Sequence, residues 1–487
     1  MDTANDKLER RLYSHDLAPL PKEMDVIFKT MPDQVVRPGY TEEVVQIVRK
    51  ARAVNKPIVP RGAGTWGLGG SVPVKGGIVV DMTAMNKIIT IDEKNMVVTT
   101  QPGITWKALG DALDAKGYFL PCYPSSAPSA TLGGWIGTGG TGIGAYKYGS
   151  AGDIVRDLEV VLPTGVVVHT GDRYVPQNGG GPNLNWLFVG SEGILGIVTE
   201  VTMMILPKPE ELRVVSYSFD DLKLFSPALK KIVRSGATPM HIMFSDRLHF
   251  EYLRAAGKEA PKVGCLITCA LTGSKASVDV EEKILDEAIA SAGGKKESKE
   301  LAEHEWHERN YEFRLREMGF GAIPGEILVP VEKFDVVVEG TRKIVKDLKM
   351  KAPIIGTVAD NNTVMLMPYY LTDEHKLVAS TAAMGFAKRL GDLAFENGGR
   401  PVGLGVFFAG NLAKYRGKEG AALIRSLKDT IDPYGIMNPG KLVETGTRYG
   451  FSMPAFLMNF GMHMMGSVKR VLPRDKIGEK ELSRLKK

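Results

Sequence analysis

The stretch Pro60-Arg-Gly-Ala-Gly-Thr-Trp-Gly-Leu-Gly-Gly70 decides the fold of this chain. A second glycine-rich stretch follows about 70 residues later, Thr131-Leu-Gly-Gly-Trp-Ile-Gly-Thr-Gly-Gly140, and a third runs Gly190-Ser-Glu-Gly-Ile-Leu-Gly-Ile-Val-Thr199. Backbone approaches a pyrophosphate closely only where side chains are absent, and successive bare N–H groups form an anion-binding nest. Three such loops predict a chain that wraps a large phosphate-bearing cofactor.

The first loop contains the letters of a dinucleotide-binding motif, but its surroundings argue against that motif. Gly62-Ala-Gly-Thr-Trp-Gly67 matches G-x-G-x-x-G, which requires a helix to open among the glycines so that its N-terminus meets the phosphates. Residues 68–77, Leu-Gly-Gly-Ser-Val-Pro-Val-Lys-Gly-Gly, cannot begin a helix. A helical pattern precedes the loop instead, over residues 44–51 with Thr41 as its cap. We therefore expect no NAD-type Rossmann domain.

Length and composition indicate a globular protein of two domains. The chain has 487 residues, of which 44% are hydrophobic and 24% charged. Its three cysteines, Cys122, Cys265 and Cys269, allow no disulfide framework and have no iron–sulfur spacing, and we expect the last two to pack in the core. Residues 1–10 contain no apolar stretch of a secretory signal, so we expect a cytoplasmic protein.

The charge of the chain is concentrated at its C-terminal end. The formal net charge is +6, and residues 467–487 hold eight Lys or Arg against three Asp or Glu. The remainder is close to neutral, which gives nucleic-acid binding little support.

The hydrophobic pattern divides the chain near residue 210. Before it, strand-like runs cover residues 78–81, 88–91, 96–100, 158–162, 166–170 and 197–206. A helix is expected from Thr105, with Gly117 ending it. Pro207-Lys-Pro-Glu-Glu211 marks the boundary, after which a strand over 214–219, a helix over 222–234 and a strand over 240–244 follow.

A series of short motifs resembles one known family in order and spacing. They are Tyr13-Ser-His-Asp16, Arg37-Pro-Gly-Tyr-Thr41, Pro60-Arg-Gly-Ala-Gly-Thr65, Val79-Val-Asp-Met82, Gln101-Pro-Gly103, Tyr148-Gly149, Leu162-Pro-Thr-Gly165, Gly190-Ser-Glu-Gly193 and Asp432-Pro-Tyr-Gly-Ile-Met-Asn-Pro-Gly-Lys441. The chain resembles the FAD-binding PCMH-type family, which includes vanillyl-alcohol oxidase and the flavoprotein subunits of D-lactate and glycolate dehydrogenases. Residues 124–135 are similar to its alkyl-dihydroxyacetonephosphate synthase branch.

The resemblance implies an α+β fold and a domain plan. A two-lobed PCMH-type FAD-binding domain would cover residues 1–210. An antiparallel-sheet cap domain, of the FAD-linked oxidase C-terminal type, would cover 211–441 and return to the FAD domain at its end. Residues 442–487 would form an extension beyond the family pattern.

The resemblance also implies which residues hold FAD. The cofactor-binding positions are Pro60, Arg61, Gly62, Ala63, Gly64, Thr65, Trp66, Pro124, Ser126, Thr131, Gly133, Gly134, Thr138, Gly139, Glu192, Gly193, Gly196, Ile197, Val198 and Asn438. Some relatives attach the flavin through a histidine near the first loop, but residues 61–70 contain neither His nor Cys. Others use a cysteine where this chain has Ala127. We therefore expect non-covalent FAD.

The catalytic half departs from the 2-hydroxy-acid branch. That branch carries H-x-G-D-G-N-x-H and G-E-H-G, whose histidines and glutamate bind a divalent metal. The matching histidine positions here hold Thr357, Val364 and Gly405, and the glutamate position holds Leu404. No histidine lies between residues 308 and 374. We expect no metal site.

Three residues remain as catalytic candidates by resemblance. Trp306-x-x-Arg309 is similar to a W-x-x-R motif whose arginine binds a substrate carboxylate, with a surface salt bridge as the alternative. Arg400 stands where the phenol-oxidising branch stabilises reduced flavin or a phenolate, and Tyr370 could relay a proton or be structural. We expect His304-Glu-Trp-His307, which lacks H-E-x-x-H spacing, to be a solvated helix face.

The expected function is that of an FAD-dependent dehydrogenase subunit. It would oxidise a 2-hydroxy-acid-like or phenol-like substrate and pass electrons to an iron–sulfur or electron-transfer flavoprotein partner. The apolar residues 451–466 and the basic stretch after them are too short to span a bilayer, and would dock a partner or the inner membrane surface, or pack on their own domain. An electron-relay or assembly subunit without substrate chemistry, and a synthase-like transferase, are the alternatives.

Overall fold

The computed structural model describes residues 2–4, 6–18, 20, 22–176, 180–310, 315, 321–372, 377–449, 452–454 and 457. They form two compact units. The first comprises the chain up to Gly142, then Gly149–Lys208 and Gly403–Met458, and the second comprises Ile143–Tyr148 and Pro209–Val402. The apolar and basic stretches expected to dock a partner lie, apart from a few residues near 452–457, outside the described residues.

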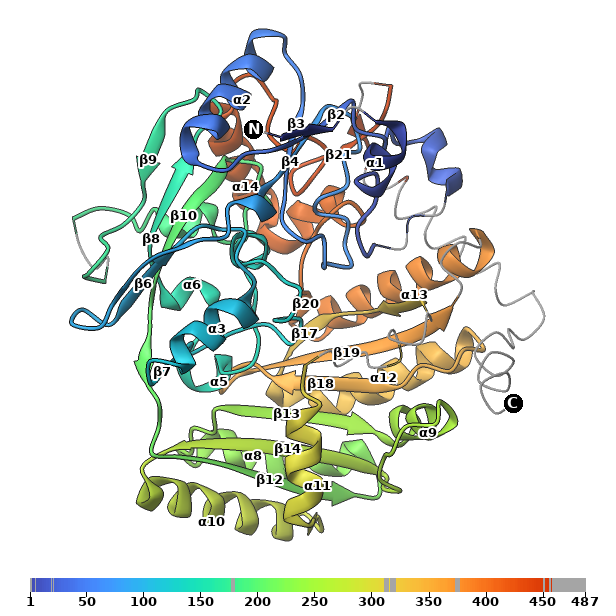
Figure 1. The fold of residues 1–487 in the computed structure, drawn as a ribbon. Coiled ribbons are helices and arrows are strands. Elements are labelled where there is room, and N and C mark those ends of the chain that lie inside the picture. Colours follow the sequence, from blue (N-terminus) through green and yellow to red (C-terminus); the bar gives the residue numbers. More distant parts are fainter. Residues whose placement is uncertain are drawn as a thin grey trace. The chain divides into compact units, whose positions relative to one another are not determined.

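The first unit contains a small, mostly parallel sheet. In spatial order its strands are β1 (Asp2–Ala4), β2 (Gln34–Arg37), β4 (Ile78–Asp81) and β3 (Ile58–Arg61), with β1 antiparallel to the others (Figure 1). Helix α2 (Thr41–Ala53) buries Val44, Ile47 and Val48 in the core behind this sheet. Arg61, at the end of β3, pairs with Asp81, at the end of β4, so the first glycine loop begins beside the end of β4.

A second sheet of the same unit is antiparallel. Its order is β5 (Ile88–Asp92), β6 (Val97–Thr100), β10 (Ile197–Met204), β8 (Val155–Val161) and β9 (Val167–His169). The third glycine motif runs directly into β10. Two sheets in one unit, followed by an antiparallel cap, give the α+β, two-lobed fold expected from the sequence.

Short elements complete the first unit. They are α1 (Lys7–Leu12), α3 (Trp106–Asp114), α4 (Leu132–Gly137), α6 (Ala151–Ile154), α7 (Asn185–Phe188) and α14 (Leu412–Ile431), with the strand pairs β7 (Tyr118–Phe119) and β11 (Leu206–Pro207), and β21 (Thr445–Gly446) and β22 (Ser452–Met453).

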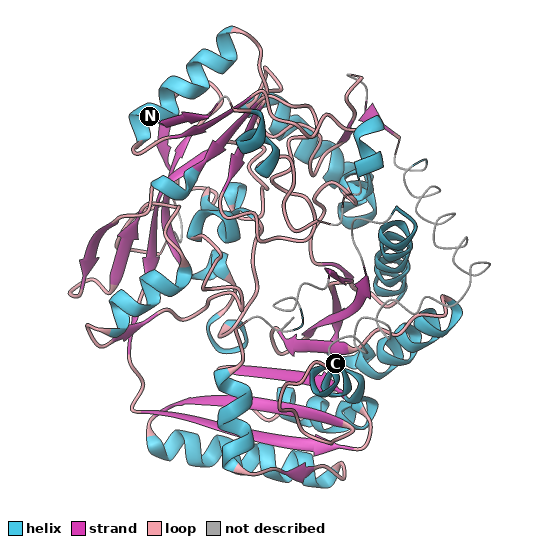
Figure 2. Cartoon of the chain, turned by 45° about the vertical axis from the view of Figure 1, so that its right-hand side comes forward, coloured by secondary structure: helices cyan, strands magenta, loops and turns pink. Residues whose placement is uncertain are grey.

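The second unit is built on a nine-stranded sheet whose pairings are antiparallel. The order is β15 (Lys295–Lys296), β12 (Glu211–Phe219), β14 (Cys265–Gly273), β13 (His241–Asp246), β18 (Ile354–Val358), β19 (Thr363–Thr372), β17 (Ile327–Pro330) and β20 (Arg400–Pro401), and β16 (Gly321–Pro324) also pairs with β19. Figure 2 distinguishes these strands from the helices packed on them.

The two faces of this sheet have different covers. Its helices are α5 (Ala145–Tyr148), α8 (Ser226–Arg234), α9 (Arg247–Ala255), α10 (Lys275–Ser291), α11 (Lys299–His307), α12 (Phe334–Asp347) and α13 (Leu377–Glu396). Helices α8, α10, α12 and α13 share one core with Ile242 and Phe244 of β13, which we call the helix-side core. The opposite face packs on α9 and carries Leu266, Met367 and Tyr369. We call this opposite face of the sheet the open-side face. Helix α11 crosses β12 and β14 (Figure 1).

Several local predictions can be compared with the structure directly. Helix α3 is capped by Thr105, whose hydroxyl accepts from Ala108 N over 3.2 Å, and Gly117 follows in the left-handed region at φ +84°, as predicted. The Thr41 cap was wrong, because α2 begins at Thr41 and the Thr41 hydroxyl donates to Glu159 Oε1 over 2.7 Å. Cys265 and Cys269 lie in the helix-side core, as expected.

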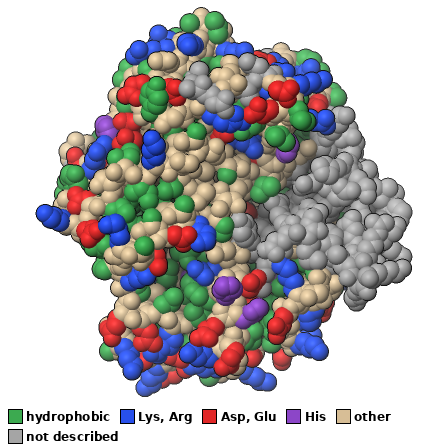
Figure 3. All heavy atoms as spheres, viewed as in Figure 1, with side chains coloured by type: hydrophobic (Ala, Val, Ile, Leu, Met, Phe, Trp, Pro, Cys, Tyr) green, Lys and Arg blue, Asp and Glu red, His purple; other side chains and the backbone are tan. Residues whose placement is uncertain are grey.

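The surface mixes charges of both signs. Figure 3 shows Lys and Arg interspersed with Asp and Glu on the visible face, without a continuous basic field. Within the described part of the chain, no helix has the length and apolar character needed to cross a membrane.

Candidate functional site: the glycine-loop cradle

The first glycine loop is irregular and closely packed. After β3, residues 62–70 contain turns but no helix, which confirms the expectation against a Rossmann motif. A Cβ added to Gly62 would lie 2.0 Å from Thr131 Oγ1. Gly64 has φ +67°, and an added Cβ would lie 2.5 Å from the Arg61 guanidinium. Only glycine satisfies both positions.

The second and third loops meet each other in the same way. Gly139 and Gly190 both have positive φ, and a Cβ on Gly139 would lie 3.2 Å from the Gly190 Cα. The backbone N–H of Glu192 donates to the Gly137 carbonyl over 2.8 Å. Gly193 has φ +72°, and an added Cβ would lie only 2.5 Å from Pro60 Cγ. The structure therefore brings the three predicted loops together through bare backbone.

Three buried polar atoms at these loops have no hydrogen-bond partner among the described residues. They are Thr131 Oγ1, Glu192 Oε2 and Asn438 Oδ1. Buried polar atoms are normally satisfied, so such a group of unsatisfied atoms indicates a polar ligand. FAD offers hydroxyl, amide and phosphate groups, and the bare-backbone loops suit its pyrophosphate. The residues fit FAD.

The motif at residues 432–441 connects the first and third loops through hydrogen bonds. Asn438 has an uncommon left-handed φ of +37°. Its Nδ2 donates to the carbonyls of Gly70 (2.9 Å) and Glu192 (2.6 Å), and its backbone N–H donates to Ile58 over 2.7 Å. Asn438 thus binds the first and the third loop at once.

A buried cation beneath the loops was not foreseen from the sequence. The Lys441 side chain is fully buried, and Nζ donates to the Val72 carbonyl over 2.6 Å. Burial lowers its pKa to about 8, and the charges of Asp16 and Glu192 oppose that shift. Asp16 accepts from the backbone N–H of Ala18 over 2.8 Å and from the Ser71 hydroxyl over 3.2 Å. The motifs containing Asp16 and Lys441 were recognised, but nothing in a single sequence signals that they share a buried environment.

The Glu192 carboxyl, near Lys441, also has a perturbed pKa. Its backbone is left-handed at φ +52°, and Oε1 accepts from the backbone N–H groups of Leu404 and Gly405 over 3.3 and 3.1 Å. Burial of the carboxyl raises its pKa to about 7, although these two hydrogen bonds oppose the shift. The residue as a whole is only half-buried, but Oε2 is inaccessible.

Other predicted cofactor positions have structural roles in this unit. Added Cβ atoms on Gly133 and Gly196 would lie 2.6 Å from Pro102 Cβ and 2.7 Å from Val160 Cγ1, so both glycines permit close packing of protein on protein. Thr138 Oγ1 donates to the Trp135 carbonyl over 2.8 Å. Ile197 is buried in the core.

Gly405, the position that the resemblance assigns to a histidine of the 2-hydroxy-acid branch, has a backbone conformation suited to glycine. Gly405 has φ +51°, and an added Cβ would lie 2.0 Å from the Leu68 carbonyl oxygen, so no side chain fits there. Leu404 is buried. In the second unit, Thr357 lies in β18 and Val364 belongs to the helix-side core. Within the described ranges, no group of three His, Cys, Asp or Glu side chains could hold a metal ion.

The catalytic candidates of the second unit have different environments. The Arg309 Cζ lies 4.4 Å from the centre of the Trp306 ring, and its Nη1 donates to the Trp306 carbonyl over 2.8 Å. Arg400 is exposed and donates to the carbonyls of Pro401 and Val402. Tyr370 is buried in the helix-side core, whereas Tyr369 points to the open-side face and shares a 2.8 Å hydrogen bond with His249 Nδ1.

The expectation of a solvated face at residues 304–307 was wrong in part. His307 is exposed, but Glu305 and Trp306 are buried, at 3% and 9% exposure, because α11 packs on β12 and β14. Trp306 lies beside His241 of β13, with ring centres 6.2 Å apart. His241 was not identified from the sequence, where one polar residue at the start of an apolar strand gives no functional signal.

Comparison with known proteins agrees with the geometry. Residues 32–171 match the FAD binding domain family, and residues 208–442 match the FAD linked oxidases, C-terminal domain family. The chain is 32% identical to glycolate oxidase subunit GlcD of Bacillus subtilis, over 90% of this chain and 93% of that protein. It is 28% identical to D-lactate dehydrogenase [cytochrome] 1, mitochondrial, of Saccharomyces cerevisiae, over 89% and 77% of the two chains.

A solved structure of alkyldihydroxyacetonephosphate synthase has a TM-score of 0.72 and 25% identity, covering 90% of this chain and 83% of that chain. The loops, the unsatisfied polar atoms and these matches agree on the cofactor and on the class of protein. The chain belongs to the FAD-linked oxidase family and is an FAD-dependent oxidoreductase.

Proposed function

We propose that this chain is a dehydrogenase subunit that oxidises a small 2-hydroxy acid and delivers the electrons to a protein partner. The observation that carries the substrate class is the fixed guanidinium of Arg309 on the Trp306 ring. The N–H geometry of a planar guanidinium matches a carboxylate, and stacking on the Trp306 ring fixes the orientation of this one. The relatives named for glycolate and D-lactate support the same class.

The residues of the chain divide the work of this reaction. The glycine loops, with Thr131, Glu192 and Asn438, would hold FAD, which when bound accepts two electrons with a hydride. Arg309 would bind and orient the substrate carboxylate. Hydride departure from the alcohol carbon requires the hydroxyl proton to leave as well, so an acceptor for that proton is needed.

A protein partner is proposed because the chain cannot assemble an iron–sulfur cluster of its own. It has three cysteines, and all three are buried and free. Electrons would therefore pass to an iron–sulfur or electron-transfer flavoprotein partner. One relative is a glycolate oxidase subunit and the other is a D-lactate dehydrogenase designated [cytochrome], and both names support an external acceptor.

The FAD is proposed to be dissociable. Loop residues 61–70 offer no histidine or cysteine for attachment, and burial raises the pKa of the Cys122 thiol to about 12. A thiol that is protonated at physiological pH is a poor nucleophile. Acid precipitation should leave the yellow colour in the supernatant, and flavin retained on the denatured polypeptide would contradict this part of the proposal.

The test is anaerobic bleaching of the oxidised flavin by a panel of D-lactate, glycolate, other 2-hydroxy acids and 4-alkylphenols. We expect one 2-hydroxy acid to bleach it rapidly. Arg309→Lys should raise the concentration for half-maximal rate at least tenfold, since an ammonium loses the paired geometry. Arg234→Lys, at an exposed arginine of the same unit, is the matched control. Bleaching by 4-alkylphenols alone would move the assignment to the phenol-like class and to Arg400.

An electron-relay subunit is the second candidate. It is favoured by Thr357, Val364 and Gly405, which stand where the 2-hydroxy-acid branch has histidines. The backbone at Gly405 excludes any side chain, so that part of the substrate machinery of the 2-hydroxy-acid branch has no place here. If no acid or phenol bleaches the flavin while a co-purified partner reduces it, the relay assignment replaces the dehydrogenase one.

A further inference from the structure

An open cavity of about 460 Å³ lies at one end of the sheet in the second unit. It is formed where β12 ends, where β14 begins and where α9 starts (Figure 1). All the residues that line it belong to the segment Pro209–Val402, so the cavity lies within one compact unit. None of them belongs to the glycine loops, so the cavity is not part of the FAD cradle.

Four cationic side chains from three separate segments line this cavity. Arg247 and Arg254 lie seven residues apart in α9, about two turns, which places them on one face of that helix. Lys262 precedes β14, and Lys295 belongs to β15. Like charges repel each other, so four cations around one cavity call for a compensating anion.

The described part of the chain does not supply that anion as an ion pair. None of the four cations lies within 4 Å of a carboxylate of a described residue. Arg254 Nη1 donates to the Pro261 carbonyl, and Arg247 Nη2 donates to the Asp220 carbonyl over 3.4 Å. Neutral backbone groups thus orient both guanidiniums. Since a guanidinium has five N–H donors, most donors of each arginine remain available for a bound anion.

Three carboxylates share the cavity with these cations, which argues against a simple inorganic anion as the ligand. They are Asp220, Glu251 and Glu297. Glu297 Oε1 accepts from the Ser218 hydroxyl. The side chains of Asp220 and Glu251 are exposed and have no hydrogen bond with a described residue. Because an ionised carboxylate only accepts hydrogen bonds, these two groups suit a ligand that carries hydroxyl donors.

The wall between β12 and β14 is built from closely packed backbone. Gly264 lines the cavity, and an added Cβ would lie 2.0 Å from the Asp220 carbonyl oxygen, to which Arg247 also donates. Directly beside it, Phe219 pairs with Cys265 in the sheet. The ends of the two strands are therefore held together, and the charged side chains around them stand on a fixed frame.

We propose that this cavity binds a phosphate ester that carries sugar hydroxyls, such as a nucleotide or a sugar phosphate. The phosphate would lie on the two arginines of α9, because planar guanidiniums bind pairs of phosphate oxygens. Lys262 and Lys295 would contribute point charges, and Glu251 would accept from the sugar hydroxyls. This would be a second ligand of the chain, and its binding does not depend on which substrate reduces the flavin.

The test is calorimetric titration of the full-length FAD-loaded protein with AMP, glucose 6-phosphate and inorganic phosphate. Adenosine and glucose are the uncharged controls. We expect one of the two esters to bind at one site per chain with a Kd of about 1 mM or lower, and neither uncharged control to bind. Inorganic phosphate should bind about tenfold more weakly, because it lacks sugar hydroxyls. The affinity should fall as NaCl is added, since exposed charges are screened.

Two substitutions test the two halves of the site. Arg247→Gln should raise the Kd for the ester about tenfold. Glu251→Ala should weaken binding of the ester but not of inorganic phosphate, because it removes an acceptor together with a negative charge. Lys275→Gln is the matched control, since this exposed lysine of α10 lies outside the cavity and its substitution makes the same change in charge as Arg247→Gln. All three residues are exposed, so the melting temperatures should not change.

Three results would overturn the proposal. They are a wild type that binds neither ester, an ester affinity that Arg247→Gln leaves the same as that of Lys275→Gln, and inorganic phosphate that binds as tightly as the esters. None of these results would affect the assignment of FAD, which rests on the loops of the first unit.

Discussion

Lys441 Nζ and the Val72 carbonyl oxygen, 369 residues apart in the chain, lie 2.6 Å apart beneath the first glycine loop. The ammonium is fully buried, and Asp16 and Glu192 supply the opposite charge around it. Asn438 also donates to the carbonyls of Gly70 and Glu192, so the motif at residues 432–441 holds the first and third loops in place. The shape of the cradle therefore depends on a segment far from the loops in sequence.

Lys441→Met should loosen this cradle. The substitution keeps the apolar stem and removes the charge, so Asp16 and Glu192 lose their compensating cation. We expect the free energy of unfolding to fall by about 1–3 kcal/mol and FAD to dissociate more readily. Urea unfolding and FAD titration measure the two effects. Lys75→Met, at a partly exposed ion pair with Glu444, should change stability by about 1 kcal/mol at most. Equal behaviour of the two variants would argue against a special role for Lys441.

Gly62→Ala should impair FAD binding more than folding. The added Cβ would lie 2.0 Å from Thr131 Oγ1, so the first two loops must separate. Overpacking of this kind costs about 1–3 kcal/mol, and we expect the Kd for FAD to rise at least tenfold. Gly110→Ala is the control, because that glycine lies inside α3 with nothing within 4 Å of an added Cβ. A Gly62→Ala protein that binds FAD normally would show that the contact relaxes freely.

The glycine loops and α3 could be predicted because their signals are local. Glycine spacing, the Thr105 cap and the apolar face of Trp106, Leu109 and Leu113 can each be recognised within about ten residues of sequence. The burial of Lys441 and His241 could not, because each depends on packing between segments that are far apart in sequence. The return of the chain to the first unit at Gly403 has no compositional mark either.

The error at residues 304–307 has the same origin. Four consecutive residues with two histidines and a glutamate read as a polar surface, but α11 turns Glu305 and Trp306 inward onto the sheet. The single tryptophan was the better guide, since a large aromatic side chain stabilises a helix by burial. At Gly405, where the resemblance places a histidine, the backbone leaves no room for a side chain.

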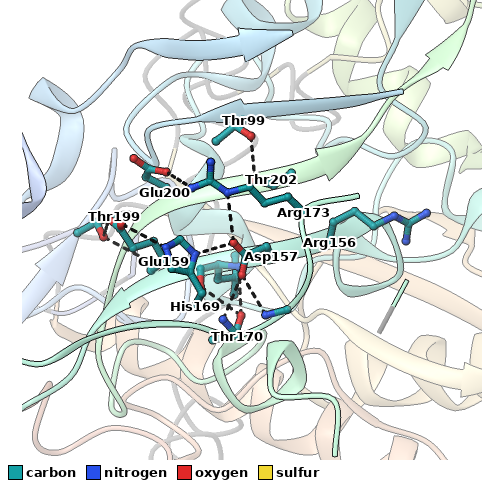
Figure 4. Close-up of polar contacts among 12 residues, drawn as sticks. Thr99, Arg156, Asp157, Glu159, His169, Thr170, Arg173, Thr199, Glu200 and Thr202 are labelled. Carbon is teal, nitrogen blue, oxygen red and sulfur yellow. Dashed lines mark hydrogen bonds and ion pairs between the residues drawn. The ribbon is translucent and has the colours of Figure 1, made fainter. Parts of the chain in front are cut away.

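Asp157 is expected to be a stability determinant of the FAD-binding unit. It is 3% exposed and binds His169 Nδ1, and it accepts from the backbone N–H groups of Thr170 and Gly171 over 3.1 and 2.9 Å (Figure 4). Asp157→Ala leaves these donors unsatisfied, so the free energy of unfolding should fall by about 1–3 kcal/mol. Asp111→Ala, at an exposed helical ion pair with Lys107, should have an effect of about 0.5 kcal/mol. Urea unfolding of both variants would decide, and equal losses would contradict the prediction.

Chelation should leave substrate oxidation intact. Gly405 has no room for a histidine, and the other positions that the resemblance would assign to metal ligands hold Thr357, Val364 and Leu404. Dialysis against EDTA should therefore change the rate of flavin bleaching by the active 2-hydroxy acid less than twofold. A rate that is lost on chelation and restored by Zn²⁺ or Mn²⁺ would show that the chain assembles a metal site from other ligands.

The Glu192 carboxyl should make the stability of the FAD-free protein depend on pH near neutrality. Its pKa is about 7 in the folded protein and has its ordinary value of 4.5 in the unfolded chain. Between these values the folded state binds more protons than the unfolded state, so the contribution of Glu192 is fully present below pH 4.5 and is lost as the pH rises through about 7.

Glu192→Gln tests this sign. The amide keeps an acceptor oxygen for the N–H groups of Leu404 and Gly405 and does not titrate. The stability of the wild type should therefore decline relative to the variant from pH 5 to pH 8, and the two should converge toward pH 4.5. Urea unfolding at four pH values measures the difference, with the exposed Glu210→Gln as a control that follows the wild type. Parallel curves for wild type and Glu192→Gln would mean that the cradle opens enough in solution to hydrate this carboxylate.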